Sequence, residues 1–476
     1  MHKKYLLALC AVLLSLVVIS PAQTIQRLNH QPPDGALIGF LLTDGTVLYQ
    51  GNGESDWYKL TPDITGSYVN GTWARMANLP AGYVPDAFAS AVLADGRVVI
   101  TGGEYLSGNF TLTNLGAIYD PRVNTWTNLP APTGWQYIGD SPSILLPNGT
   151  YMVGNKLTKQ DAILNPKTLT WTVLPGNGKA DFDAEEGWTL LADGSILTED
   201  VKNAPNSERH TQSNRTWATA GSTIVDLHSP SQFGCIHYGP NNSLCYYPPG
   251  EIGPAILRPD GTVFATGSNS STGSGAGHTA IYNTATGMWT VGPDFPNGDN
   301  AGDSFAVLLP SGNVLVEGFF SSYEWDGTSL TQTLATPGSL IVLPTGQVLV
   351  GGTEVYNPTG TYDASWAPTI TSVTTSVTRG KTYKISGTQF NGLSQAASFG
   401  DEYETATNYP LVRITNNSTG HVFYARTHNH STMGVATGTA IVSTSFDVPK
   451  TAETGASSLE VVANGIPSIA VSITVN

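Results

Sequence analysis

Ala91-Val-Leu-Ala-Asp-Gly-Arg-Val-Val-Ile-Thr-Gly-Gly103 is an apolar run that is closed by a short turn and reopened by a second apolar run. Each half is typical of a short buried strand, and Asp95-Gly96 favours a two-residue hairpin turn because glycine tolerates positive φ. Six further copies of the pattern occupy residues 40–49, 144–154, 190–197, 256–267, 307–318 and 341–352. Seven hairpins of one kind predict a repeated all-β architecture.

The spacing of the copies predicts how each repeat unit is built. Their turn glycines lie 34 to 67 residues apart, a length that suits one four-stranded propeller blade. After four of the hairpins a tryptophan follows seven positions behind a tyrosine, leucine or histidine, as in Tyr119 and Trp126. We expect the hairpin to form the two inner strands of a blade and this stretch the two outer ones, with the tryptophan packed between neighbouring blades. The last two units lack that tryptophan, which leaves open how the ring closes.

The pattern changes at residue 367. Residues 380–390 and 458–462 alternate polar and apolar side chains, and short strands of this kind are typical of an immunoglobulin-like sandwich. The predicted fold class is therefore all-β. A seven-bladed β-propeller is expected over residues 23–366, with an insertion at about 226–250, followed by an immunoglobulin-like β-sandwich over residues 367–476.

Two features of the repeat resemble a known family. Paired glycines after an apolar strand, as at Gly102-Gly103 and Gly351-Gly352, followed by tyrosine and then tryptophan, resemble the kelch repeat. Seven such units before a C-terminal β domain resemble the galactose-oxidase-like kelch proteins, over residues 36–476. The resemblance implies a kelch-type propeller and an early-set immunoglobulin-like domain. It implies less about function, because propellers host many unrelated activities.

The first 22 residues have the pattern of a bacterial-type secretory signal peptide. Basic residues at positions 2–4 precede an apolar run at 5–19 and small residues at 20–22. The apolar run is too short to cross a membrane comfortably, and nothing comparable follows it. We therefore expect a secreted protein, extracellular or periplasmic, without a membrane span. In such an oxidising compartment Cys235 and Cys245, ten residues apart, are expected to form one disulfide.

The charge balance excludes one class of partner. Removal of Lys3 and Lys4 with the signal peptide reduces the 21 basic residues to 19, against 36 acidic residues. Nucleic acid and anionic membrane surfaces both require basic patches, so neither is expected as a partner.

Carboxylates recur at one position of the repeat. In five units an acidic residue stands eight or nine residues before the turn of the inner hairpin, at Asp86, Asp140, Glu185, Glu251 and Asp303. If the units are equivalent, these acids form a collar at one mouth of the propeller channel. A collar of this kind could hold a divalent cation through oxygen ligands, or a polyhydroxylated or cationic ligand through hydrogen bonds. The alternative is that each acid caps its own loop by accepting backbone N–H groups.

A second group of candidate ligand-binding residues is Arg426, His428 and His430. In the resembled family a loop of the C-terminal domain offers a histidine to copper, and the matching stretch makes His428 that residue and a weak catalytic candidate. His428 and His430 need not share a role. The alternative role for His428 is a hydrogen bond to propeller backbone that joins the two domains.

The remaining parts of a copper-radical site match poorly. Tyr137 is placed somewhat like the family's cross-linked tyrosine, which makes it the other weak catalytic candidate. Its cysteine partner would have to be Cys235 or Cys245, which are better explained by each other. The adjacent Tyr-His pair that supplies two further ligands is absent. A catalytic copper site is therefore not expected, and copper belongs only to the oxidase alternative.

The sequence thus favours a secreted binding or interaction protein without catalytic activity. Its partner would be an extracellular glycan, a small polar ligand or another protein, recognised at the axial face of the propeller, with His428 lining or plugging the channel. One alternative is a galactose-oxidase-like copper-radical oxidase of alcohols or sugars. Another is a structural cell-surface or matrix platform.

Overall fold

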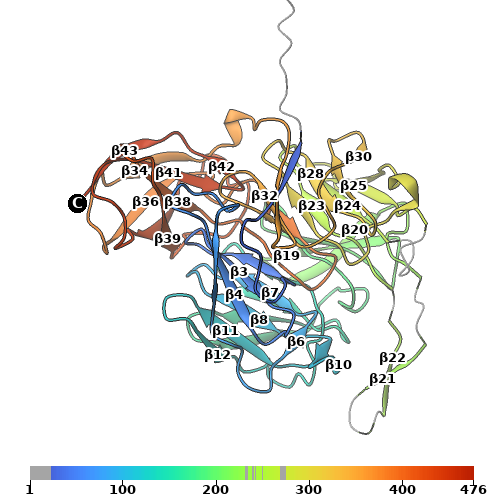
Figure 1. Ribbon diagram of the computed structural model, residues 1–476. Helices are drawn as coiled ribbons and strands as arrows, with labels where there is room; N and C mark the ends of the chain where they lie inside the picture. Colours follow the sequence, from blue (N-terminus) through green and yellow to red (C-terminus); the bar gives the residue numbers. More distant parts are fainter. Residues whose placement is uncertain (1–22, 231–233, 239–240, 242, 249, 269–274) are drawn as a thin grey trace, which may run out of the picture.

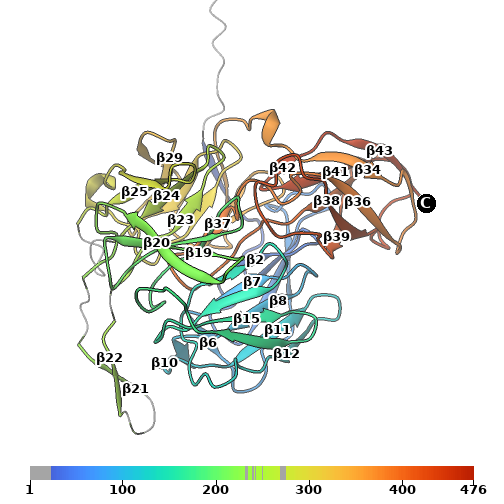
Figure 2. The same cartoon turned by 180° about the vertical axis from the view of Figure 1, so that it is seen from behind.

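The computed structural model describes residues 23–476 except 231–233, 239–240, 242, 249 and 269–274. The predicted signal peptide lies outside the described residues. Seven antiparallel sheets of four or five strands follow one another along the described chain, and the strands of the C-terminal region gather at one side of them (Figures 1 and 2). The expected all-β, propeller-type fold class is confirmed. Among the described residues, no helix has the length and apolar character needed to cross a bilayer.

The strands of each sheet run from the inner to the outer edge in chain order. The first three sheets are β2 (Gly39–Leu41), β3 (Val47–Gln50), β4 (Trp57–Thr61) and β5 (Thr72–Arg75); β7 (Ala89–Val92), β8 (Val98–Thr101), β11 (Gly116–Asp120) and β12 (Thr125–Asn128); and β13 (Ser143–Leu145), β14 (Tyr151–Gly154), β15 (Asp161–Asn165) and β16 (Thr170–Leu174). The next two are β17 (Thr189–Leu190), β18 (Ile196–Glu199), β19 (Asn206–Thr211) and β20 (Thr216–Ser222); and β23 (Ala255–Leu257), β24 (Thr262–Thr266), β25 (Thr279–Asn283) and β26 (Met288–Val291).

The last two sheets depart from this plan. One contains β27 (Ala306–Leu308), β28 (Val314–Glu317), β29 (Ser322–Trp325) and β30 (Leu330–Gln332), and it gains β37 (Ala397–Ser398) beside its inner strand. The other contains β31 (Leu340–Val342), β32 (Val348–Val350) and β33 (Glu354–Asn357), and its outer strand is β1 (Thr24–Arg27) from the start of the described chain.

Strand β1 therefore answers the question of closure that the sequence left open. It pairs antiparallel with β33, so that Ile25 lies opposite Tyr356 and Gln26 opposite Val355. The inner strand of this last sheet, β31, contacts β2 of the first sheet. The two ends of the repeat region are thus joined by main-chain hydrogen bonds as well as by packing.

The hairpin turn is longer than the two-residue turn that Asp95-Gly96 favoured. Gly96 N donates to Leu93 O at 2.8 Å, and Leu93 N donates to Arg97 O at 2.7 Å, which makes a three-residue loop. The turn glycines of all seven copies have φ between 76° and 84°, the left-handed conformation that such a loop requires at its last residue. The side chain of Asp95 accepts a hydrogen bond from Arg97 N at 3.1 Å, so it shapes the turn.

The tryptophans lie where the seven-residue spacing predicted them. Trp126 is directly opposite Tyr119 in the pairing of β11 with β12, with ring centroids 5.0 Å apart. Its indole N–H donates to Ala77 O of the preceding unit at 3.1 Å. Trp289 likewise donates to Ser207 Oγ in the preceding sheet at 2.9 Å. The predicted packing of tryptophan between neighbouring sheets is confirmed.

The C-terminal strands form a separate, larger sheet with its own buried core. Its strands are β34 (Thr369–Val373), β35 (Ser376–Val377), β36 (Thr382–Thr388), β38 (Leu411–Asn416), β39 (Val422–His428), β40 (Val442–Asp447), β41 (Gly455–Ala463), β42 (Ile466–Pro467) and β43 (Val471–Val475). The alternation read from residues 380–390 appears in β36, where buried Ile385 lies between the less buried Lys384 and Ser386. The change from small sheets to this sheet falls between β33 and β34.

Candidate functional site

An acidic cavity lies at the centre of the small sheets. Its volume is about 540 Å³, and eight of its lining side chains carry carboxyl groups. All five of the acids predicted from the repeat are among them. The eight are Asp86, Glu104, Asp140, Glu185, Glu251, Asp303, Asp401 and Glu402.

The predicted acids reach the cavity because each stands three or four residues before an inner strand. Asp140, for example, precedes β13, and Asp303 precedes β27. Glu185 and Asp303 have φ of 58° and 48°, a left-handed conformation that is uncommon for residues other than glycine. Such conformations persist only where the surrounding structure enforces them, and they are concentrated at functional sites.

The remaining acids of the cavity come from two positions that the sequence analysis did not use. Glu104 follows β8, the second strand of its hairpin. The chain before the first strand of a hairpin and the chain after the second strand lie at the same edge of the sheet. A search of both positions in every unit would have found Glu104, and also Lys156 after β14.

Asp401 and Glu402 are delivered by the C-terminal region. The connection from β36 to β38 leaves the large sheet and enters the centre of the small ones, where β37 pairs with β27 and also contacts β23 and β31. Gln395 accepts a hydrogen bond from Leu190 N at 2.6 Å, and Ser90 Oγ donates to Glu404 O at 3.0 Å. Residues 389–410 are therefore the axial segment of this protein.

Tyr403 of the axial segment holds one predicted acid in place. Its hydroxyl donates a short hydrogen bond to Asp86 and accepts one from Ala87 N at 2.7 Å. Its ring packs edge-on against Phe88 at 5.1 Å and Phe399 at 5.3 Å. This wall of the cavity is therefore fixed by both hydrogen bonding and aromatic packing.

A lysine without solvent access lies behind the acids. The ammonium of Lys156 is 2.7 Å from Glu185 Oε1, contacts Asp140 Oδ2, and is 3.4 Å from Glu104 Oε1. Burial opposes the charge of Lys156, but Asp140 and Glu185 raise its pKa well above the usual value. Burial likewise opposes ionisation of Glu185, but the Lys156 ammonium lowers the pKa of that carboxyl below its usual value. Lys156 and Glu185 are therefore an ion pair at neutral pH.

Several other carboxyl groups of the cavity experience the opposite effect. Burial raises the pKa of Asp303, Asp401 and Glu402 well above the usual range, and neighbouring carboxylates add to this effect. Burial and the nearby Glu185 raise the pKa of Glu251 to about 7. Near neutral pH Glu251 is therefore partly protonated and can donate a hydrogen bond, whereas ionised Glu185 only accepts one.

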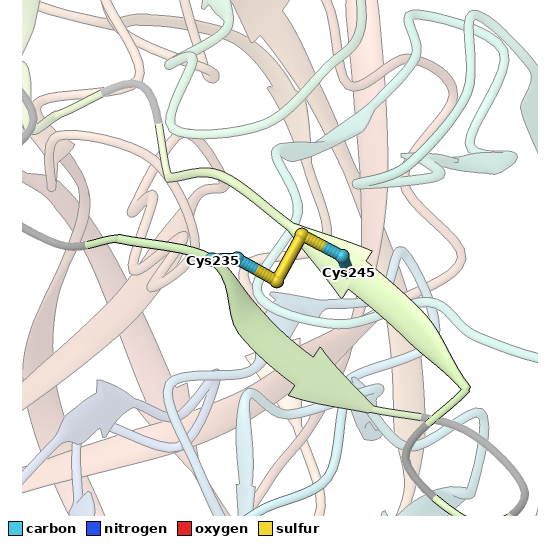
Figure 3. Close-up of a disulfide and its surroundings, with 2 residues drawn as sticks. All are labelled: Cys235 and Cys245. Atoms are coloured by element: carbon cyan, nitrogen blue, oxygen red, sulfur yellow. A yellow bond between two sulfur atoms is a disulfide. The ribbon is translucent and has the colours of Figure 1, made fainter.

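The predicted disulfide is present, and in the sequence it lies shortly before Glu251 of the cavity. Cys235 and Cys245 are bonded, with Cα atoms 5.4 Å apart (Figure 3). They close a hairpin of β21 (Ile236–Tyr238) and β22 (Leu244–Tyr246), which extends away from the sheets within the predicted insertion (Figures 1 and 2). Tyr246 at its end donates to Glu185 Oε1 at 3.2 Å, and the Lys156 ammonium is 5.3 Å from the centre of its ring.

The structure does not bring the second predicted group to the cavity. His428 Nε2 lies 3.1 Å from Asp447 Oδ1 within the C-terminal sheet. Arg426 donates to Asp95 O at 2.5 Å, at a hairpin turn, and His430 Nδ1 contacts Thr444 Oγ1 at 2.9 Å. Arg426, rather than His428, makes a side-chain bond to propeller backbone. The segment that enters among the inner strands is 389–410, the long connection between β36 and β38, whose strand β37 pairs with β27.

The cavity does not fit a copper-radical centre. Its lining contains neither histidine nor cysteine. Both cysteines of the described chain are used in the disulfide, and Tyr137, whose carbonyl accepts from Asn155 Nδ2 at 2.9 Å, is not among the lining residues. Carboxylate oxygens instead suit hard cations such as Ca²⁺. One oxygen from each of Glu185, Glu251 and Asp401 lies within 4.8 Å of the others.

Comparisons with known proteins agree with the fold. No family model matches the chain. A kelch-like protein, terF, of Aspergillus terreus is 29% identical over 98 residues, which are 20% of this chain and 21% of that protein. The chain thus spans about a fifth of the length of this curated relative.

Two solved structures are similar in shape. A fungal alcohol oxidase of the AA5 family, in complex with copper, superposes with a TM-score of 0.51 at 14% identity, over 96% of this chain and 100% of that one. Virginiamycin B lyase of Staphylococcus aureus superposes with a TM-score of 0.46 at 11% identity, over 70% of this chain and 98% of that one. At these identities the likeness concerns the fold alone. The chain therefore has a propeller-type fold similar to that of a galactose-oxidase-like enzyme.

Proposed function

We propose that this protein binds a small polyhydroxylated ligand, a carbohydrate, in the acidic cavity at the centre of its sheets. The observation that carries the proposal is the convergence of eight carboxyl groups, from the repeat units and from the axial segment, on one cavity of about 540 Å³. Pockets for small ligands have volumes of about 300 to 1,000 Å³.

The mixture of charge states in the cavity supports a neutral ligand with many hydroxyl groups. A hydroxyl both donates and accepts, so it complements ionised Glu185 as well as Glu251, which is partly protonated near neutral pH. Two aromatic side chains of the lining are partly open to solvent, Tyr105 at 37% and Phe319 at 53%, and offer apolar faces to a sugar ring.

A divalent cation in the same cavity is a second candidate. Glu185, Glu251 and Asp401 bring oxygens close enough together to share one ion. The oxidase alternative is less well supported, because the cavity contains no soft or nitrogen ligand for copper. The platform alternative gives no reason for eight carboxyl groups to share one cavity.

The proposal extends to the location and architecture of the protein. We take the seven sheets as the blades of one ring and residues 367–476 as an immunoglobulin-like domain. The signal pattern at residues 1–22 and the disulfide together support secretion, where extracellular glycans are available as ligands.

The test is titration calorimetry of the purified protein with neutral mono- and oligosaccharides selected on a glycan array, and with spermine as a cationic probe. The Glu251→Gln/Asp303→Asn variant keeps the shape of the cavity but removes two carboxyls. We expect it to bind the selected saccharide at least about tenfold more weakly, a loss of about 1.4 kcal/mol.

The matched control is Asp294→Asn, which lies outside the cavity and pairs with His278. It should bind as the wild type does. Equal affinity in the cavity variant would contradict the proposal. If spermine binds and no saccharide does, the ligand of the cavity is cationic and the proposal of a neutral sugar is wrong.

A further inference from the structure

A second acidic cluster is buried between two neighbouring sheets, outside the axial cavity. Three of its carboxyls and its one lysine lie on the connection from β16 to β17, and the others come from β15, β19 and the end of β18. Each of these side chains belongs to a buried residue. The cluster consists of Asp161, Lys179, Asp181, Asp183, Glu186, Asp200 and Glu208.

Lys179 is the cation of this cluster. Its ammonium lies 2.8 Å from Glu186 Oε2, 2.8 Å from Glu208 Oε2 and 3.0 Å from Asp181 Oδ1. One ammonium cannot neutralise six carboxylates, and an unpaired buried carboxylate is costly. In their ionised forms these six carboxyl groups carry more negative charge than Lys179 compensates.

Several carboxyl oxygens of the cluster have no hydrogen-bond donor. Asp181, Glu186 and Asp200 each use one oxygen, to Lys179 or Asn203, while Asp181 Oδ2, Glu186 Oε1 and Asp200 Oδ1 have no hydrogen-bond partner. One side of each carboxylate is thus anchored and the other is free to bind a ligand.

The buried side chain of Asp183 gives separate support for a ligand in this cluster. Its side chain has no solvent exposure, and neither of its oxygens accepts a hydrogen bond. Asp183 Oδ1 lies 4.0 Å from the Lys179 ammonium, so it points toward the group that Asp181 and Glu186 contact. A fully buried carboxyl group without a donor, beside other carboxyl groups, is in an environment that a bound cation would stabilise.

The spacing of the oxygens suits one ion. One oxygen from each of Asp181, Glu186 and Asp200 lies within 4.8 Å of the others. Calcium–oxygen distances are about 2.3 to 2.6 Å, so two ligands of one Ca²⁺ ion lie at most about 5 Å apart. Oxygen-only ligands favour this hard cation over zinc or copper.

We propose that Asp181, Glu186 and Asp200, with Asp183 beside them, form a structural Ca²⁺ site that stabilises the contact between the third and fourth sheets. The ion supplies the positive charge that Lys179 alone does not provide. This site is separate from the axial cavity, and the proposal does not rest on carbohydrate binding.

The first experiment measures metal content and stability of the full chain. After dialysis against calcium and then against metal-free buffer, elemental analysis should find one calcium per wild-type chain. The melting temperature should be higher in calcium than after treatment with a chelator. A wild-type protein without stoichiometric calcium, whose melting temperature does not respond to calcium or chelator, would overturn the proposal.

The second experiment locates the ion. Tb³⁺ replaces Ca²⁺ and emits when a nearby tryptophan is excited, and Trp217 is 5.4 Å from the Lys179 ammonium. We expect tryptophan-sensitised emission from the wild type and from Glu251→Gln/Asp303→Asn, the axial variant. The Asp181→Asn/Glu186→Gln variant should lose both the emission and the bound calcium.

Emission that survives in Asp181→Asn/Glu186→Gln but disappears in the axial variant would place the ion in the cavity and refute this site. If the cluster variant does not fold, the calcium content and calcium response of the wild type and the axial variant still decide the question.

Discussion

The ammonium of Lys156 lies 2.7 Å from Glu185 Oε1, with no solvent access to the lysine side chain. One of the acids predicted from the repeat is therefore held by a buried cation from the neighbouring sheet. The hydroxyl of Tyr246 donates to the same oxygen. Three units of the chain, namely the third sheet, the fourth sheet and the disulfide hairpin, thus meet at one carboxylate.

Replacement of Lys156 by methionine should destabilise the protein strongly. Asp140 and Glu185 would remain buried without their cation, and the loss of one partner of a buried pair costs about 3 to 5 kcal/mol. Chemical denaturation measures the free energy of unfolding. Lys167→Met, at an exposed lysine, is the control and should change it by less than about 0.5 kcal/mol. If the free energy of unfolding also changes by less than about 0.5 kcal/mol in Lys156→Met, the contacts of Lys156 with Asp140 and Glu185 do not stabilise the fold.

Deletion of residues 23–27 should open the ring. The outer edge of β33 would lose its partner β1, and an unpaired strand edge invites association with other chains. We expect the melting temperature to fall by at least about 2 °C and larger species to appear in size-exclusion chromatography. The Thr24→Ala/Gln26→Ala variant keeps the backbone pairing and should remain monodisperse. An unchanged melting temperature after the deletion would mean that β1 does not close the ring in solution.

Stability should fall as the pH rises toward neutrality. Burial raises the pKa of Glu251 from 4.5 to about 7, so the folded state binds more protons than the unfolded state between these values. The free energy of unfolding therefore decreases with rising pH across this window, by up to about 3 kcal/mol for this residue.

Denaturation at several pH values, in the presence of a chelator, measures this slope. Glu251→Gln removes the titrating group and should flatten the curve in that window. Glu354→Gln, on strand β33, should leave it unchanged. A wild-type curve that is flat or rises from pH 4.5 to 7 would contradict the prediction.

Removal of the disulfide should loosen the hairpin that carries Tyr246. A closed loop of about ten residues stabilises by about 3 kcal/mol in the chain-entropy model. In Cys235→Ser/Cys245→Ser we expect rapid proteolytic cleavage within residues 226–250 and weaker binding of the saccharide. Tyr246→Phe, which removes only the hydroxyl, is the control and should resist the protease. A variant that resists cleavage as the wild type does would show that the hairpin holds without the bond.

Much of the scaffold could be predicted because its signals are local. The pairing of Tyr119 with Trp126 follows from their spacing, since two antiparallel strands with a short turn place such residues opposite each other. The acids of the collar recur at one position relative to a recurring hairpin, so Asp140 and Asp303 could be placed at the same mouth. The turn itself was one residue longer than expected, because Gly96 is the left-handed third residue of its loop.

The axial segment and the partners of Lys156 could not be found in this way, because they depend on contacts between distant segments. Nothing near Lys156 in the sequence indicates that Asp140 and Glu185 surround it. The axial segment was missed because His428 matched a family motif, whereas Asp401 and Glu402 lie in a connection without a recognisable pattern.

Local sequence signals are sufficient to predict the repeated hairpins, the inner and outer strands, the disulfide pair and the acids before five of the seven inner strands. These depend on periodicity and turn chemistry within a few tens of residues. Only the tertiary structure decided that β1 completes the last sheet, that residues 389–410 enter the ring, and that Lys156 and Lys179 are each buried among carboxyls. The physical reason is that these pairings are selected by burial and charge compensation between segments that meet only in the folded chain.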